Sequence, residues 1–201
     1  MAPTRRSILQ ILAAAPAAAA FTWTEAEAQQ AHQHAEAATA TAQATKTPFK
    51  PKFFSAHEYA TVRMLVDIVI PKDDRSGSAT DAGVPEFMDF IMGDEPTRQL
   101  AMRGGLAWLD RECVNRYEKT FVACTEAERT KLLDDVAWPG KAPAGMSHGV
   151  AFFNTFRDLT ASGFWTSRMG IKDLQYLGNV FVAEWKGCPD EVLKKLGVTR
   201  A

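Results

Sequence analysis

The sequence predicts an all-α fold, and three observations carry that prediction. Apolar residues recur at helical spacing in several separate stretches between residues 50 and 201. Two capping boxes and several prolines mark where those stretches begin and end. No stretch alternates apolar and polar residues over enough positions to require a sheet. We therefore expect a small, irregular helical domain of about five to seven helices after a disordered N-terminal segment.

The first expected helix begins after Ser55, which forms a capping box with Glu58. Pro71 ends this helix, and a polar loop at residues 72–83 follows. A second helix is expected from Val84 to about residue 92, with a proline in its first turn. The buried face of the first helix consists of apolar residues at helical spacing: Tyr59, Val62, Leu65, Val66 and Val69.

Three further helices and two helical turns are expected beyond residue 95. A long helix runs from Pro96 to about Lys119, and a second capping box starts the next helix at Thr125. After a loop at residues 138–148 that is rich in Pro and Gly, four apolar residues mark another helix that ends near Gly163: Phe152, Phe153, Phe156 and Leu159. Short helical turns are then expected around residues 173–177 and 189–196.

The N-terminus is typical of an export signal. Arg5 and Arg6 precede an apolar run at residues 8–20, which resembles a twin-arginine signal. As a helix, this run would reach only ~20 Å, against roughly 30 Å for a bilayer core, so a membrane anchor is the weaker interpretation. Cleavage is expected after Ala28, with the stretch ending at Ala20 as an alternative. We therefore predict a signal peptide at residues 1–28 and a periplasmic protein.

Residues 29–49 are expected to form a flexible linker between the signal and the helical domain at residues 50–201. Ala, Gln, Thr, Glu and His dominate this part of the chain, and they bury too little surface to offset the entropy of ordering. His32 and His34 lie in this segment without a third candidate metal ligand nearby, so a metal site there is disfavoured.

The composition and the motifs argue against several functions. The net charge is −1 and there is no dense Lys/Arg block, so nucleic-acid binding lacks an electrostatic basis. No dinucleotide fingerprint, haem-attachment motif or nucleophile elbow occurs, so we expect no cofactor and no metal in this chain. Asp73, Asp74 and Asp81 lack the spacing of a calcium loop, and loop capping is the favoured role for them.

Three cysteines are present, and two of them can pair in an oxidising compartment. Cys188 lies in a turn, whereas Cys113 lies inside an expected helix. We expect any disulfide to join Cys188 to Cys113 or to Cys124.

Several motifs together resemble the gluconate 2-dehydrogenase subunit 3 family. They are Phe54-Ser55-Ala56-His57-Glu58, the turn Ile70-Pro71-Lys72-Asp73-Asp74, and Ala82-Gly83-Val84-Pro85-Glu86-Phe87. Gly105-Leu106 with Leu109-Asp110 and the aromatic block at residues 152–165 agree as well. The resemblance covers roughly residues 50–197. The C-terminal part differs from the plainest gluconate-type pattern, which leaves gluconate as the substrate in doubt.

The resemblance implies a non-catalytic small subunit that works with partners. The expected partner is a large flavin subunit of the glucose-methanol-choline type, which holds FAD, and in some complexes a cytochrome c subunit with haem c joins. The large subunit would be exported by the twin-arginine translocase while bound to the small one, and membrane association would come through partners. Aromatic and Arg side chains are the usual anchors of protein interfaces. On that basis we expect part of the contact with the flavin subunit at Phe164, Trp165, Arg168, Tyr176 and Trp185.

Two other functions stay open from the sequence. One is a stand-alone periplasmic binding or scaffold protein without redox chemistry. The other is a free-standing enzyme for which Asp73, Asp74 and His148 would be the polar groups. Likewise, all the C-terminal aromatic residues could belong to the core instead of an interface.

Overall fold

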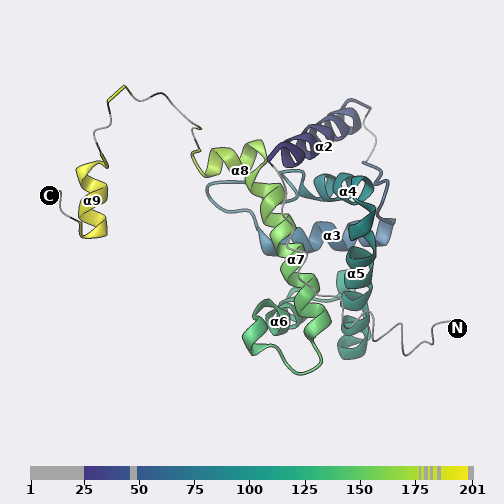
Figure 1. Ribbon diagram of the computed structural model, residues 1–201. Coiled ribbons are helices and arrows are strands. Elements are labelled where there is room, and N and C mark those ends of the chain that lie inside the picture. Colours follow the sequence, from purple (N-terminus) through teal and green to yellow (C-terminus); the bar gives the residue numbers. More distant parts are fainter. Residues whose placement is uncertain are drawn as a thin grey trace, which may run out of the picture.

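A computed structural model describes residues 25–45, 49–176, 178, 181, 183–184 and 187–198. These residues form eight α-helices and two short 3-10 helices, and none of the described residues lies in a strand (Figure 1). Seven of the α-helices lie within residues 50–201. The predicted all-α fold is therefore confirmed.

The structure confirms the predicted first residues of the first three helices after residue 50. Helix α3 spans Ala56–Val69, and the Ser55 hydroxyl accepts from the Glu58 amide while the Glu58 carboxylate accepts from the Ser55 amide. Helix α4 spans Val84–Asp94 with a proline in its first turn, and α5 spans Pro96–Tyr117. Helix α4 begins after Gly83, whose φ of 78° is in the left-handed region that favours glycine.

The second half of the domain is built around one long helix. The 3-10 helix η1 (Phe121–Ala123) and helix α6 (Glu126–Ala137) follow α5, and Thr125 and Glu128 form the second predicted capping box. After the 3-10 helix η2 (Pro139–Lys141), helix α7 spans Ser147–Trp165 and crosses the domain, with α6 near its start and α8 at its end (Figure 1). Helix α8 spans Arg168–Asp173, and α9 spans Asp190–Leu196 and stands apart from the other helices (Figure 1).

The boundaries differ from the sequence-based expectation mainly around α7. This helix begins five residues before the first phenylalanine of the predicted stripe and continues through Gly163 to Trp165. Gly163 lies inside the helix, and an added Cβ there would meet the Phe87 side chain at 2.9 Å, so its lack of a side chain allows close packing of α7 on α4. The following helical turn forms at Arg168–Asp173, before the predicted residues 173–177.

The structure also differs from the expectation of a flexible linker at residues 29–49. Helix α2 spans Glu25–Thr45 and packs against α4 and α7. Large apolar residues are absent from α2, but it is rich in Ala, the strongest helix former. Ala28 is buried in its first turn, so cleavage after Ala28 would divide α2. The alternative ending at Ala20 lies outside the described residues.

The core lies where α3, α4, α5 and α7 meet. It consists mostly of Phe, Leu, Met and Val side chains, with aromatic rings contributed by α4, η1 and α7. Its largest fully buried members are Phe87, Phe121, Phe156, Phe164, Leu65, Met88, Ile91, Met92, Leu109, Leu132, Leu159 and Val62.

Candidate partner interface

Apolar side chains are exposed on the short segment where α7 passes into α8 and the chain leaves the domain. Trp165 is 38% exposed and Tyr176 is 63% exposed, and Ile171 and Leu174 lie between them along the chain. Phe181, 90% exposed, continues the series. We call Trp165, Ile171, Leu174 and Tyr176 the α7–α8 patch. Several exposed apolar residues close in sequence are typical of a protein-binding surface.

Local contacts fix the backbone beneath this patch. Ser167 caps α8, because its hydroxyl accepts from the Gly170 amide at 3.0 Å and donates to the Phe164 carbonyl at 2.6 Å. A Cβ on Gly170 would overlap the Phe164 carbonyl, so the turn between α7 and α8 needs glycine there. Arg75, from the loop between α3 and α4, donates to the Asp173 carbonyl at 2.6 Å and pairs with the Asp173 carboxylate at 3.0 Å. The patch therefore rests on an ordered turn.

The five expected interface residues do not share one environment. Phe164 is 1% exposed and belongs to the core, where its ring meets the Trp165 ring edge-on at 4.9 Å. Successive helical residues point in different directions, so Phe164 enters the core while Trp165 reaches the surface. Phe164 is therefore unsuited to a partner contact, and that part of the expectation is wrong.

The remaining expected interface residues are exposed or lie outside the described part of the chain. Arg168 is exposed and pairs with Glu36 of α2 at 3.1 Å. Tyr176 is exposed and belongs to the α7–α8 patch. Trp185 lies outside the described residues, as do Arg5 and Arg6 of the export signal.

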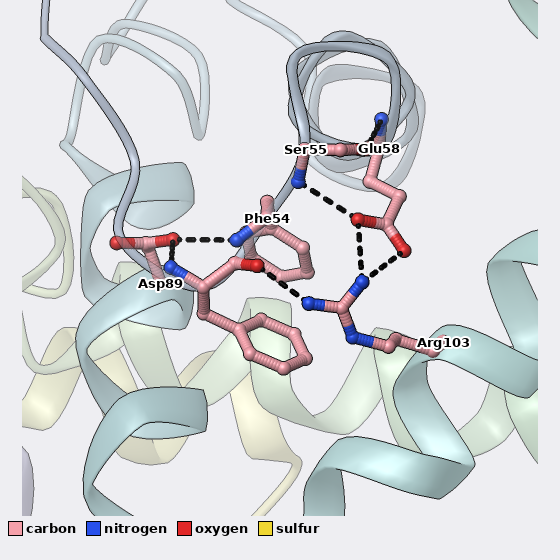
Figure 2. Close-up of polar contacts among 6 residues, drawn as sticks. Phe54, Ser55, Glu58, Asp89 and Arg103 are labelled. Atoms are coloured by element: carbon pink, nitrogen blue, oxygen red, sulfur yellow. Dashed lines mark hydrogen bonds and ion pairs between the residues drawn. The ribbon is translucent and has the colours of Figure 1, made fainter.

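A buried carboxylate that was not among the predicted site residues anchors the segment before α3. Asp89 of α4 accepts from the backbone amides of Lys52 and Phe53 at 2.8 and 2.9 Å. It also accepts from the Phe54 amide at 3.0 Å (Figure 2). An acidic residue inside the run Phe87–Met92 was the signal available in the sequence. Three amide donors stabilise a buried carboxylate, so Asp89 has a structural role.

Arg103 of α5 completes this network from the other side. Its guanidinium donates to the Phe53 carbonyl at 2.8 Å and lies 4.4 Å from the centre of the Phe53 ring (Figure 2). It also pairs with the Glu58 carboxylate at 3.2 Å, the same carboxylate that closes the capping box. The residues before α3 are thereby tied to α4 and α5.

Several residues that carried the family resemblance have packing roles. Gly105 lies against Phe152, whose ring a Cβ on Gly105 would overlap. Asp110 accepts from the Phe121 amide at 2.9 Å and pairs with His57, so it joins α5 to η1 and α3.

Two of the three cysteines are buried and one is exposed. Cys113 and Cys124 are both buried thiols, and they lie close enough to each other to hydrogen bond. Burial, with the neighbouring Cys124 thiol, raises the pKa of Cys113 to about 12. Cys188 is exposed. Neither expected pairing of Cys188 is present in the structure, because the buried thiols belong to the core cluster around α5 and η1.

The polar groups considered for metal binding or catalysis have other uses. The Asp73 carboxylate accepts from the Arg75 and Ser76 amides at 2.9 and 2.8 Å, which lowers its pKa and stabilises a turn. His148 is exposed in the first turn of α7, and Asp81 bonds to Ser78 instead of capping α4. Within the described part of the chain, no three His, Cys, Asp or Glu side chains are placed to hold a metal ion. No helix among the described residues combines the length and apolarity needed to cross a membrane.

These features define a small all-α protein with a packed core and an exposed aromatic patch at one end. The chain belongs to the gluconate 2-dehydrogenase subunit 3 family, whose sequence profile matches residues 56–184. The resemblance inferred from the sequence is thus confirmed, and the family consists of accessory subunits of a dehydrogenase complex. A comparison with curated proteins and one with solved structures each gave no match.

Proposed function

We propose that this chain is the non-catalytic small subunit of a periplasmic, FAD-dependent sugar or alcohol dehydrogenase complex. Its partner is a large flavin subunit of the glucose-methanol-choline type, with a cytochrome c subunit as a third member in some complexes. The chain binds and stabilises the flavin subunit and carries it through the twin-arginine route. The observation that carries this proposal is the family match over residues 56–184, since a subunit 3 works beside other subunits.

The α7–α8 patch supports the proposal because it offers a surface suited to a protein partner. Trp165 and Tyr176 are exposed aromatic residues on a backbone fixed by Ser167 and Gly170. Anchors on an ordered surface lose little conformational entropy on binding, so they contribute more affinity than flexible ones. We therefore assign Trp165, Arg168 and Tyr176 to the contact with the flavin subunit.

The interface assignment is tested by substituting an exposed anchor. Tyr176→Ala should weaken binding of the flavin subunit by about 2 kcal/mol or more if it is a hot spot. Leu100→Ala is the matched control, because Leu100 is also an exposed apolar residue but lies on α5. Both variants should melt like the wild type. Equal affinity of the two variants and the wild type would refute the assignment.

The export part of the proposal is tested at the arginine pair. Changing Arg5 and Arg6 together to Lys should hold both this chain and the flavin subunit in the cytoplasm, because the flavin subunit is proposed to travel bound to this chain. Cell fractionation with antibodies to both proteins measures this. A periplasmic flavin subunit in the variant strain would contradict the escort role.

A further inference from the structure

Helix α2 is held on the domain by small side chains, by two histidine rings that stack on phenylalanines of α4, and by an ion pair with α8. Its buried face is formed by Ala28, Ala31, His32 and Ala35, which follow the i, i+3, i+4, i+7 spacing of one helical face. Three alanines bury much less apolar area than Leu or Phe would in the same places. His32 is the largest side chain on this buried face, because His34, which also stacks on α4, is exposed. Helix α2 also lies outside the residues that match the family.

His32 sits between α4 and the end of α7. Its ring stacks on Phe87 with a centroid distance of 4.8 Å, and its Nε2 atom lies 2.6 Å from the Thr166 hydroxyl oxygen. The Thr166 hydroxyl donates to the Ser162 carbonyl at 2.6 Å, so it can only accept from His32. Nε2 therefore carries the hydrogen, and a neutral ring satisfies this contact. Only 7% of His32 is exposed.

The surroundings of His32 favour the neutral ring. Burial is the largest influence and lowers the pKa of His32. Two groups act in the opposite direction and raise the pKa of His32. They are the Glu36 carboxylate on the same helix and the Gly163 carbonyl on α7. Glu36 is itself paired with Arg168 of α8. The residue of α4 that stacks on the His32 ring is Phe87, which is uncharged. The opposing groups do not overcome burial, so protonation is less favourable when α2 is docked than when it is released.

We propose that His32 is a latch that holds α2 on α4 and α7 while it is neutral and releases α2 when it is protonated. Release would uncover Phe87 and would separate Arg168 from Glu36, next to the α7–α8 patch. The inference concerns the docking of α2 alone and does not depend on the proposed function.

The direction of the pH effect follows from linkage. Released His32 has an ordinary pKa of about 6.5, and docked His32 has a lower one. Docking is therefore strongest above about pH 6.5. It weakens as the pH falls below that value, by up to about tenfold per pH unit until the pKa of the docked form is reached.

Hydrogen exchange of the full chain, read by mass spectrometry and corrected for intrinsic rates, tests the latch. Between about pH 7.5 and about pH 5.5, the protection of α2 amides should fall, by up to about tenfold. Peptides from α5 and α7 should keep their protection. Unchanged protection of α2 across this range would overturn the proposal.

Two variants distinguish His32 from its neighbours. His32→Gln keeps an N–H donor but cannot be protonated. In this variant the fall in α2 amide protection between about pH 7.5 and about pH 5.5 (the pH step) should disappear, whether the helix stays docked or is released. His34→Gln is the matched control: His34 is exposed, stacks on Phe90 at 4.4 Å, and its loss should leave the pH step in place. A pH step that persists in His32→Gln would refute the latch. So would an NMR titration of wild-type His32 that gives a pKa of about 6.5 or higher.

Discussion

Removing the Asp89 carboxylate should destabilise the domain by an amount that its three hydrogen bonds predict. The Phe54 amide is buried, so losing its acceptor costs about 1–3 kcal/mol. The Lys52 and Phe53 amides are only partly buried and can return to water, so each contributes about 0.5–1 kcal/mol. Together these give about 2–5 kcal/mol for Asp89→Ala.

Asp89→Asn separates the charge from the shape of the side chain. Oδ1 accepts from both Phe53 and Phe54, and the amide oxygen of Asn can take that place. Its nitrogen then faces the Lys52 amide, where Oδ2 had accepted. One hydrogen bond is lost and two donors oppose each other, which costs about 1–2 kcal/mol.

Urea unfolding followed by circular dichroism measures both variants. With a slope of about 2 kcal/mol per molar urea, the midpoint should fall by about 1–2.5 M for Asp89→Ala and by about 0.5–1 M for Asp89→Asn. Asp94→Asn is the control, because Asp94 is exposed near the end of the same helix. If Asp89→Ala unfolds at the same urea midpoint as Asp94→Asn, the reasoning is refuted.

Two further predictions follow from close packing and burial. Gly170→Ala should destabilise the turn between α7 and α8 by about 2 kcal/mol or more, because the new Cβ would overlap the Phe164 carbonyl. Gly104→Ala, which has open space around it within α5, should be neutral or slightly stabilising; equal melting temperatures of the two variants would contradict this account. In native alkylation, exposed Cys188 should react first, whereas the buried thiols should react only in denaturant. Mass spectrometry that finds the buried thiols modified as fast as Cys188 would contradict that order.

The helix starts were predictable because they depend on local chemistry. Ser55 with Glu58 is a short-range pattern whose two reciprocal hydrogen bonds form within one turn of chain. Pro85, in the first turn of α4, likewise acts through its own backbone. Such signals need no knowledge of the rest of the fold.

What the sequence could not provide depends on contacts between distant segments. Asp89 meets amides more than thirty positions earlier in the chain, and His32 meets Thr166 across 134 positions. The burial of Phe164 beside an exposed Trp165 depends on which face of α7 meets the core. Helix α2 was overlooked because its buried residues are small, and composition alone does not distinguish a docked Ala-rich helix from a linker.

The central claim is that this chain binds a flavin subunit and holds no cofactor itself. Native mass spectrometry and visible absorption of the tagged chain, purified from its own cells, test it most directly. The account predicts a complex of this chain with one glucose-methanol-choline type polypeptide and one FAD, and a colourless chain once the two are separated. A chain that purifies alone, or that keeps one equivalent of flavin or haem after separation, would contradict it.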